Sequence, residues 1–250
     1  MDYVSAALNA GVAVLGEKPM ADNVAQTEEM IRLAEKNHTF LMEAMWTRCF
    51  PAVRQARQWL QEGKIGQVLT VHSFHSFLAD PKDWQLWKAS LAHTGGAVRD
   101  VGVYALGMAF LAFPQGPEKI MSCCRTNGEV DIHADMLLQY GEGKAAFLSA
   151  GFDMEGNATT TIFGEKGRIT LGPNLCCPSQ LQFIPNQGEP EVIELPYPAT
   201  GMQFEVLRVQ ECLAQGLLEC PDFTWEESLK ICGVIDQLRR EWGIRYASDR

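Results

Sequence analysis

The sequence predicts an α/β segment followed by an α+β domain with an open, mainly antiparallel sheet. Helical and strand patterns alternate through the first part of the 250-residue chain, which is typical of parallel α/β structure. From Gly66 onward, short strand patterns follow one another with connections of hairpin length, which favours antiparallel pairing. Two helical patterns finish the chain.

The first part contains short elements with recognisable ends. Residues 3–10 carry apolar side chains at the spacing of one helix face, and Gly11 is placed to end this helix. The apolar run 12–15 then predicts a buried parallel strand. Asp22 or Asn23 can cap a second helix. The remaining elements of this part are a strand at 40–42 and a helix from Pro51 to Gly63.

The second part is rich in strands. Alternating apolar and polar residues, separated by glycine-containing turns, indicate a half-buried sheet. Thr224 and Glu227 have the spacing of a capping box at the start of the last helix. The predicted strands cover residues 68–75, 132–140, 145–152, 159–163, 168–171, 181–184 and 192–195.

Composition excludes several classes of protein. With 46% hydrophobic residues the chain can bury a large core, and a net charge of −10 argues against binding nucleic acid. The longest apolar run, 101–113, is too short to span a membrane and is interrupted by glycines. The eight cysteines include no C-x-x-C pair. We therefore expect a cytoplasmic protein with reduced thiols.

Three segments carry a family resemblance. Gly16-Glu17-Lys18-Pro19 follows a predicted strand, and Gly95-Gly96-Ala97-Val98-Arg99-Asp100-Val101-Gly102-Val103-Tyr104 lies further along the chain. Together with the segment 42–51, they resemble the Gfo/Idh/MocA oxidoreductases, and within that family the branch that oxidises dihydrodiols. The resemblance extends through all 250 residues. It implies oxidation of trans-dihydrodiols or of sugars such as D-xylose by hydride transfer to NADP.

The chain departs from this family at its beginning. Family members start with a dinucleotide-binding Rossmann domain whose first turn reads G-x-G-x-x-G, and these 250 residues contain no such pattern. We therefore interpret residues 1–48 as the C-terminal remnant of that domain and residues 49–250 as an α+β substrate and dimerisation domain. Two parallel strands alone make no stable sheet. This interpretation predicts impaired activity, and a non-catalytic dimerisation module is the alternative.

The resemblance supplies candidate catalytic residues. Lys18 follows a parallel strand at its carboxyl end, where α/β sheets place ligands, although a lysine in a turn is often only a surface residue. Tyr104 is the candidate general acid/base. Its phenol pKa, ordinarily about 10, has to fall for that role, and we expect the ammonium group of Lys18 to lower it. Asp100 lies one helical turn before Tyr104. An Asp at this position is equally a helix N-cap.

Other residues have weaker support. By the same resemblance, Glu17, Lys18 and Pro19 contact the cofactor, while Trp46 and Arg48 contact the substrate. One predicted strand carries an alternating set of possible metal ligands, Asp131, His133 and Asp135, which suggests a metal site. The same alternation fits the solvent-facing side of a half-buried strand better, so no metal is assigned. Trp84 and Trp87 are further candidates for substrate contact. In the family the open sheet face serves contacts between subunits, which implies a homodimer.

Overall fold

The computed structural model describes residues 2–80, 82, 87–156 and 158–249. It contains two compact units. The terminal unit combines Met1–Cys49 with Met202–Arg250, and the sheet unit is Phe50–Gly201. The first division lies next to the predicted boundary at 48/49. Residues 202–250 pack with the N-terminal segment, whereas the predicted division grouped them with the sheet.

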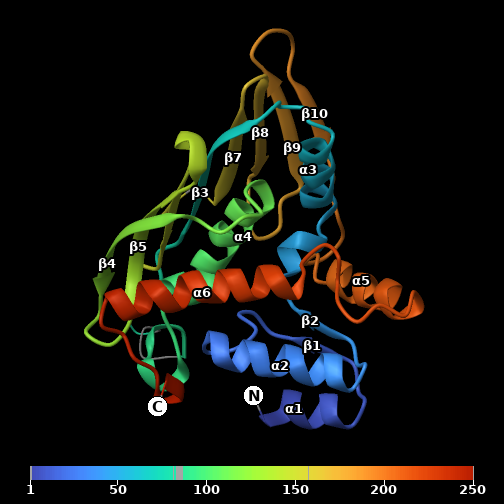
Figure 1. The fold of residues 1–250 in the computed structure, drawn as a ribbon. Coiled ribbons are helices and arrows are strands. Elements are labelled where there is room, and N and C mark those ends of the chain that lie inside the picture. The colour runs from blue at the N-terminus through green and yellow to red at the C-terminus, as the bar shows by residue number, and fades with distance from the viewer. Residues whose placement is uncertain (1, 81, 83–86, 157, 250) are drawn as a thin grey trace. The chain divides into compact units, whose positions relative to one another are not determined.

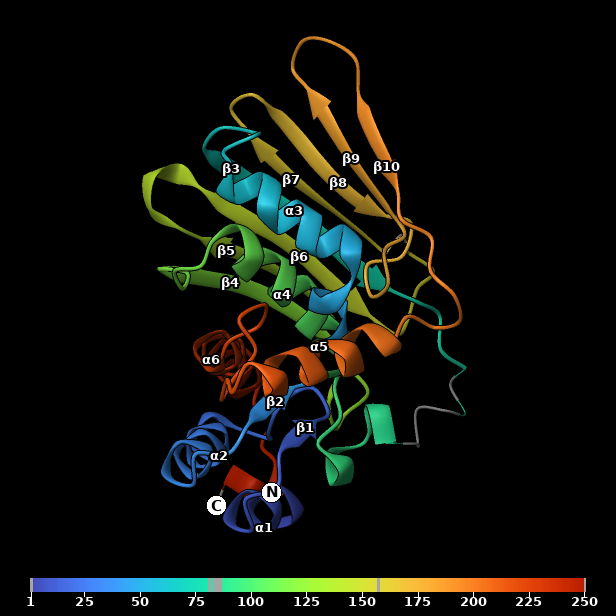
Figure 2. The same ribbon diagram turned by 90° about the vertical axis from the view of Figure 1, so that its right-hand side faces the viewer.

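The terminal unit consists of helices on a small parallel sheet (Figures 1 and 2). Strands β1 and β2 pair in parallel with Val14 opposite Leu41, close to the two predicted strands. One apolar core lies among α1, α2 and α6, and a second joins β2 and η1 to α5. The elements are α1 (Asp2–Asn9), β1 (Val14–Gly16), α2 (Val24–Lys36), β2 (Leu41–Glu43), η1 (Trp46–Cys49), α5 (Gln203–Ala214), α6 (Trp225–Glu241) and η7 (Ala247–Asp249).

A buried ionic network ties the ends of this unit together. The side chain of Asn23 caps α2 by accepting a hydrogen bond from the N–H of Gln26. Asp236 of α6 accepts the N–H of Val24 at 3.1 Å and pairs with Arg239 at 2.7 Å. Arg239, which is 2% exposed, also pairs with Asp249 in η7. The network therefore links the start of α2, the last turns of α6 and the C-terminal segment. The predicted capping box at Thr224 and Glu227 is confirmed.

The sheet unit is built on eight strands in the order β10-β9-β8-β7-β3-β6-β5-β4. Among the strand pairs of the described residues in this sheet, β3 and β6 alone are parallel, which confirms the expected open, mainly antiparallel sheet. Helices α3 and α4 lie on the same face of it (Figure 2). The elements are α3 (Pro51–Gln61), β3 (Val68–Ser76), η5 (Val98–Gly102), α4 (Val103–Ala112), β4 (Lys119–Thr126), β5 (Asp131–Gln139), β6 (Ala145–Gly151), β7 (Thr159–Gly164), β8 (Gly167–Gly172), β9 (Gln180–Pro185) and β10 (Glu191–Glu194).

The start of the central helix is held by a carboxylate from a neighbouring strand. A π-helical turn, Val98–Gly102, leads directly into α4. Asp131 of β5 accepts the N–H of Val98 at 2.7 Å. Gly96 has φ +137°, and a Cβ atom there would lie 2.3 Å from Asp131 Oδ1, so this close approach requires glycine. Burial raises the pKa of Asp131 to about 6, although hydrogen bonds from Val98 and Ala97 oppose the rise.

Two expectations about this region were wrong. Asp100 was a candidate N-cap, but the helix begins at Val98, so Asp100 lies inside the helical segment and Asp131 provides the cap. Strand β4 was not among the predicted strands. Its sequence, Lys119–Thr126, lacks a clear alternation because it forms the edge of the sheet and five of its eight residues are exposed.

Replacing Asp131 should change how stability depends on pH. The pKa of Asp131 is about 4 in the unfolded chain and about 6 in the folded protein. Because the folded protein holds this proton more tightly, it loses stability as the pH rises from about 4 to about 6. The free energy of unfolding of the wild type, relative to D131N, should therefore fall by up to about 3 kcal/mol over this window and stay constant above it. Urea unfolding at pH 4.5, 5.5 and 7.5 measures this difference. A difference that is independent of pH contradicts the prediction.

Replacing Arg239 by Met should destabilise the terminal unit by about 3–5 kcal/mol at pH 7, because it removes the buried cation that pairs with Asp236 at 2.7 Å and leaves this acid with the longer contact to exposed Arg240. Arg239 also lowers the pKa of Asp249, so the interaction contributes above the unfolded pKa of that acid and is lost as pH falls. The loss measured by urea unfolding should therefore shrink toward pH 3. R240M is the matched control, because Arg240 is 59% exposed and lies 3.4 Å from Asp236. Equal effects of the two changes would contradict this account.

Candidate functional site

The first group of candidate residues forms a turn at the carboxyl end of β1. Glu17, Lys18 and Pro19, here named the E-K-P turn, follow Gly16 directly, and the Lys18–Pro19 peptide bond is cis. The Glu17 carboxylate accepts the Lys18 N–H at 3.2 Å. Met20 and Ala21, which come next, are buried and anchor the turn on the core. The carboxyl end of a parallel strand is where α/β sheets bind ligands.

The residues of this turn fit one end of a nicotinamide dinucleotide. Lys18 supplies an ammonium group. On α5, within electrostatic range of Glu17, the Oε2 atom of Glu205 is buried without a hydrogen-bond partner in the described structure. Such an atom is a place where a bound polar molecule can contribute the missing hydrogen bond. The glycine-rich turn that holds the pyrophosphate is not part of these 250 residues.

Trp46 and Arg48, the predicted substrate residues, belong to η1 in the terminal unit. Arg48 is 3% exposed and pairs with Glu227 at 2.5 Å, and its guanidinium lies 5.4 Å from the centre of the Phe223 ring. Glu227 is also the residue that closes the capping box of α6. Arg48 thus has a structural role as an internal ion pair. Trp46 is partly buried.

The second group lies on the helix of the sheet unit. Tyr104, in the first turn of α4, is 7% exposed, and Asp100 lies one turn earlier with Lys88 Nζ 3.4 Å from its Oδ2. The ring of His75 on β3 is tilted by 31° to that of Tyr104, with 5.8 Å between ring centres. Cys176 Sγ contacts this imidazole, 3.3 Å from Nδ1 and 3.7 Å from Nε2.

Sequence reasoning missed His75 and Cys176. They come from β3 and from the connection between β8 and β9, and no motif links them to Tyr104. Their only sequence signal is the position of His75 among the residues that alternate toward the helix-covered face of β3, as Val71 and Ser73 do. Trp84 lies outside the described residues.

The alternating residues of β5 separate into two environments. Asp131 caps the helix, whereas His133 contacts Asp153 at 2.8 Å, Asp135 at 3.4 Å and Ser149 at 3.3 Å. The three residues therefore do not converge on one point. Within the described ranges, no group of three histidine, cysteine or acidic side chains has the arrangement of a metal site.

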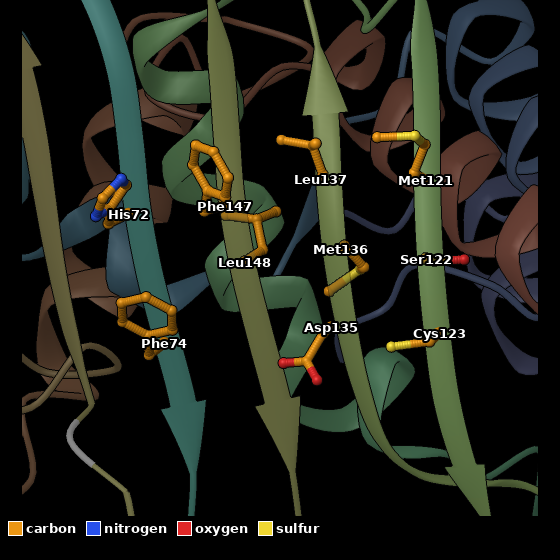
Figure 3. Close-up of a pocket in the computed structure, with 10 residues that line it drawn as sticks. All are labelled: His72, Phe74, Met121, Ser122, Cys123, Asp135, Met136, Leu137, Phe147 and Leu148. Carbon is orange, nitrogen blue, oxygen red and sulfur yellow. The ribbon is translucent and has the colours of Figure 1, made fainter.

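The open face of the sheet carries an apolar pocket of about 570 Å³ (Figure 3). Phe74, Met121 and Phe147 are each between 40% and 45% exposed there, which is unusual for large apolar side chains. Its lining comes from β3, β4, β5 and β6: His72, Phe74, Met121, Ser122, Cys123, Asp135, Met136, Leu137, Phe147 and Leu148.

Among the described residues, no helix has the length and apolarity to span a membrane.

Comparisons with known proteins agree with this architecture. Residues 1–45 match the model of an oxidoreductase family with an NAD-binding Rossmann fold, and residues 53–170 match the GFO/IDH/MocA C-terminal domain. The chain is 33% identical to trans-1,2-dihydrobenzene-1,2-diol dehydrogenase from Sus scrofa, covering 97% of this chain and 74% of that protein. The enzyme of that name from Homo sapiens is 32% identical with the same coverage.

Solved structures give the same result. An aldose-aldose oxidoreductase from Caulobacter crescentus, in complex with glycerol, is 26% identical with a TM-score of 0.82, over 96% of this chain and 72% of that one. A 3-ketoreductase from Actinomadura kijaniata, in complex with NADP, has a TM-score of 0.80 at 23% identity, over 96% and 74% of the two chains, and shows the shared fold. The chain therefore belongs to the Gfo/Idh/MocA family of nicotinamide-dependent oxidoreductases.

Proposed function

We propose that this protein uses NADP to oxidise a secondary alcohol of a trans-dihydrodiol or of a sugar such as D-xylose. The observation that carries the proposal is its 29–34% identity, over 97% of the chain, to enzymes named for the oxidation of a trans-dihydrodiol. The E-K-P turn and the helix that carries Asp100 and Tyr104 are both intact in this sequence.

The roles follow from the chemistry of removing a hydride from an alcohol. The bound nicotinamide accepts the hydride. Tyr104 takes the hydroxyl proton, and Lys18 stabilises negative charge on the alcohol oxygen electrostatically. Asp100, paired with Lys88, fixes the polar end of the helix that carries Tyr104. Glu17 and Pro19 contact the cofactor.

For substrate binding, we propose that Trp46 forms an apolar wall. We place Arg48 in the same substrate site. Its ion pair with Glu227 holds the guanidinium in a fixed position there. This assignment accommodates the carbon skeleton of either a dihydrodiol or a sugar.

The same proposal includes a homodimer, with a second copy covering the open sheet face. Exposed Phe74, Met121 and Phe147 support it, since apolar patches of this kind are typical of interfaces. We propose the cytoplasm as its location, consistent with eight cysteines that are all thiols.

A second candidate function is a non-catalytic dimerisation module. It is favoured by one observation: these 250 residues contain no G-x-G-x-x-G turn. Titration of the protein with NADPH, followed by tryptophan fluorescence, separates the two. Quenching at micromolar NADPH supports the enzyme, and no response up to millimolar NADPH supports the module.

Replacing either catalytic candidate should abolish most of the activity. We expect K18M and Y104F each to lower kcat for diol or D-xylose oxidation at least about 100-fold, since each removes a group that acts on the reacting oxygen. The matched control is Y140F. Tyr140 is an equally buried tyrosine in the sheet unit, and its hydroxyl has no partner in the described structure. Wild-type kcat in Y104F would refute the role of Tyr104.

A charge in the open face should prevent dimerisation. Phe147 lies in the pocket with its ring 5.1 Å from that of His72, so F147E places a carboxylate where the second copy would pack. We expect light scattering after size exclusion to show a dimer for the wild type and a monomer for F147E. L207E is the control, because Leu207 on α5 is 51% exposed and lies in the other unit. A monomeric wild type overturns the dimer.

A further inference from the structure

Glu205 lies in the terminal unit, in the first turn of α5. This helix packs on η1 and lies beside β2 (Figures 1 and 2). Its residues Phe204 and Val209 contact the core that contains Cys49 and Met42. The helix therefore stands next to the strand pair that carries the E-K-P turn. The charge of Glu17 contributes to the raised pKa of Glu205, so the two carboxyl groups lie within electrostatic range of one another.

The carboxyl group of Glu205 has an unusual environment. Its Oε2 atom is buried and forms no hydrogen bond within the described structure. The cation on the same helix is engaged elsewhere, because Arg208 pairs with Glu211 at 2.8 Å and with Asp222 at 2.7 Å. An unsatisfied buried carboxyl oxygen destabilises a protein, so its presence requires another explanation.

The groups that face Glu205 favour its neutral form. Burial, followed by the charge of Glu17, raises its pKa to about 7. The charge of Glu205 acts in turn on Cys49 of η1, whose own pKa is raised mainly by burial. A carboxylate in the first turn of a helix normally gains from the helix dipole. Here, burial and the second acid outweigh that gain, so a large share of Glu205 carries a proton at neutral pH.

We propose that Glu205 is a binding residue of the E-K-P turn, whose neutral carboxyl group donates a hydrogen bond to an uncharged oxygen of the molecule bound there. This oxygen belongs to the carboxamide of the nicotinamide or to a hydroxyl of the alcohol substrate. The inference rests on the proposed function, which places a cofactor and an alcohol at this turn. It explains why the buried Oε2 atom of Glu205 has no hydrogen-bond partner within the described structure.

The experiment compares two replacements at this position with a control on the same helix. E205Q keeps a hydrogen-bond donor but cannot ionise, whereas E205M keeps the length and removes both properties. E211Q is the control, because Glu211 lies on the same helix with a side chain that is 52% exposed. Affinity for NADPH is measured by tryptophan fluorescence at pH 6.0 and 8.5, and KM for D-xylose is measured in parallel.

For the wild type, the neutral fraction of Glu205 falls about 30-fold between these pH values if its pKa is about 7. If the carboxamide is the partner, raising the pH from 6.0 to 8.5 should lower the affinity for NADPH by up to about 30-fold more in the wild type and in E211Q than in E205Q. Any change that E205Q itself shows reports titration of the cofactor. E205M should bind NADPH at least about tenfold more weakly at pH 6.0. If the partner is a substrate hydroxyl, the same pattern appears in KM while NADPH binding is unchanged.

Stability provides a readout that needs no ligand. Both E205Q and E205M should unfold at higher urea concentration than the wild type at pH 8.5, because they remove a buried charge. Higher stability together with weaker ligand binding in E205M supports a binding role. If E205M binds NADPH and substrate like the wild type, the inference is overturned while the proposed function stands. A wild type without any response to NADPH overturns both.

Discussion

The contact between the Asp131 carboxylate and the N–H of Val98 determines where the candidate acid/base stands. It joins a strand of the sheet to the first turn of the helix that carries Asp100 and Tyr104. Glycine is required at Gly96, because a Cβ atom there would overlap the carboxylate. At Gly102 a Cβ atom would lie 3.2 Å from Ala150 on β6, which is a tight contact. Gly96 and Gly102 thus allow the helical segment to lie close to the sheet, and this close packing sets the positions of Asp100 and Tyr104.

Buried charges in this protein fall into two kinds. Arg48 and Arg239 are almost inaccessible, yet each is paired with a carboxylate, so they hold segments of the chain together. Glu205 is different, because one of its oxygens is buried with no partner in the part of the chain that the structure describes. Charges that are buried in a protein are normally paired, whereas a buried carboxyl oxygen without a partner marks a candidate binding site.

Local patterns in the sequence were enough to predict most elements of the fold. The strand before the E-K-P turn, the capping box at Thr224 and the open antiparallel sheet all depend on neighbouring residues or on short periodicities. The cap supplied by Asp131 and the contact of His75 with Tyr104 could not be predicted, because each joins elements far apart in the chain. The packing of residues 202–250 on residues 1–49 is of the same kind.

The terminal unit is made from both ends of the chain, and this has a consequence for the order of folding. During synthesis, residues 50–201 leave the ribosome before α5 and α6 exist, so the sheet unit has all its strands first. Until then, α1 and α2 have an apolar surface that α6 does not yet cover, because Trp225 and Leu229 of α6 form part of their core. That part of their apolar surface therefore stays uncovered by α6 until the last helix has been synthesised.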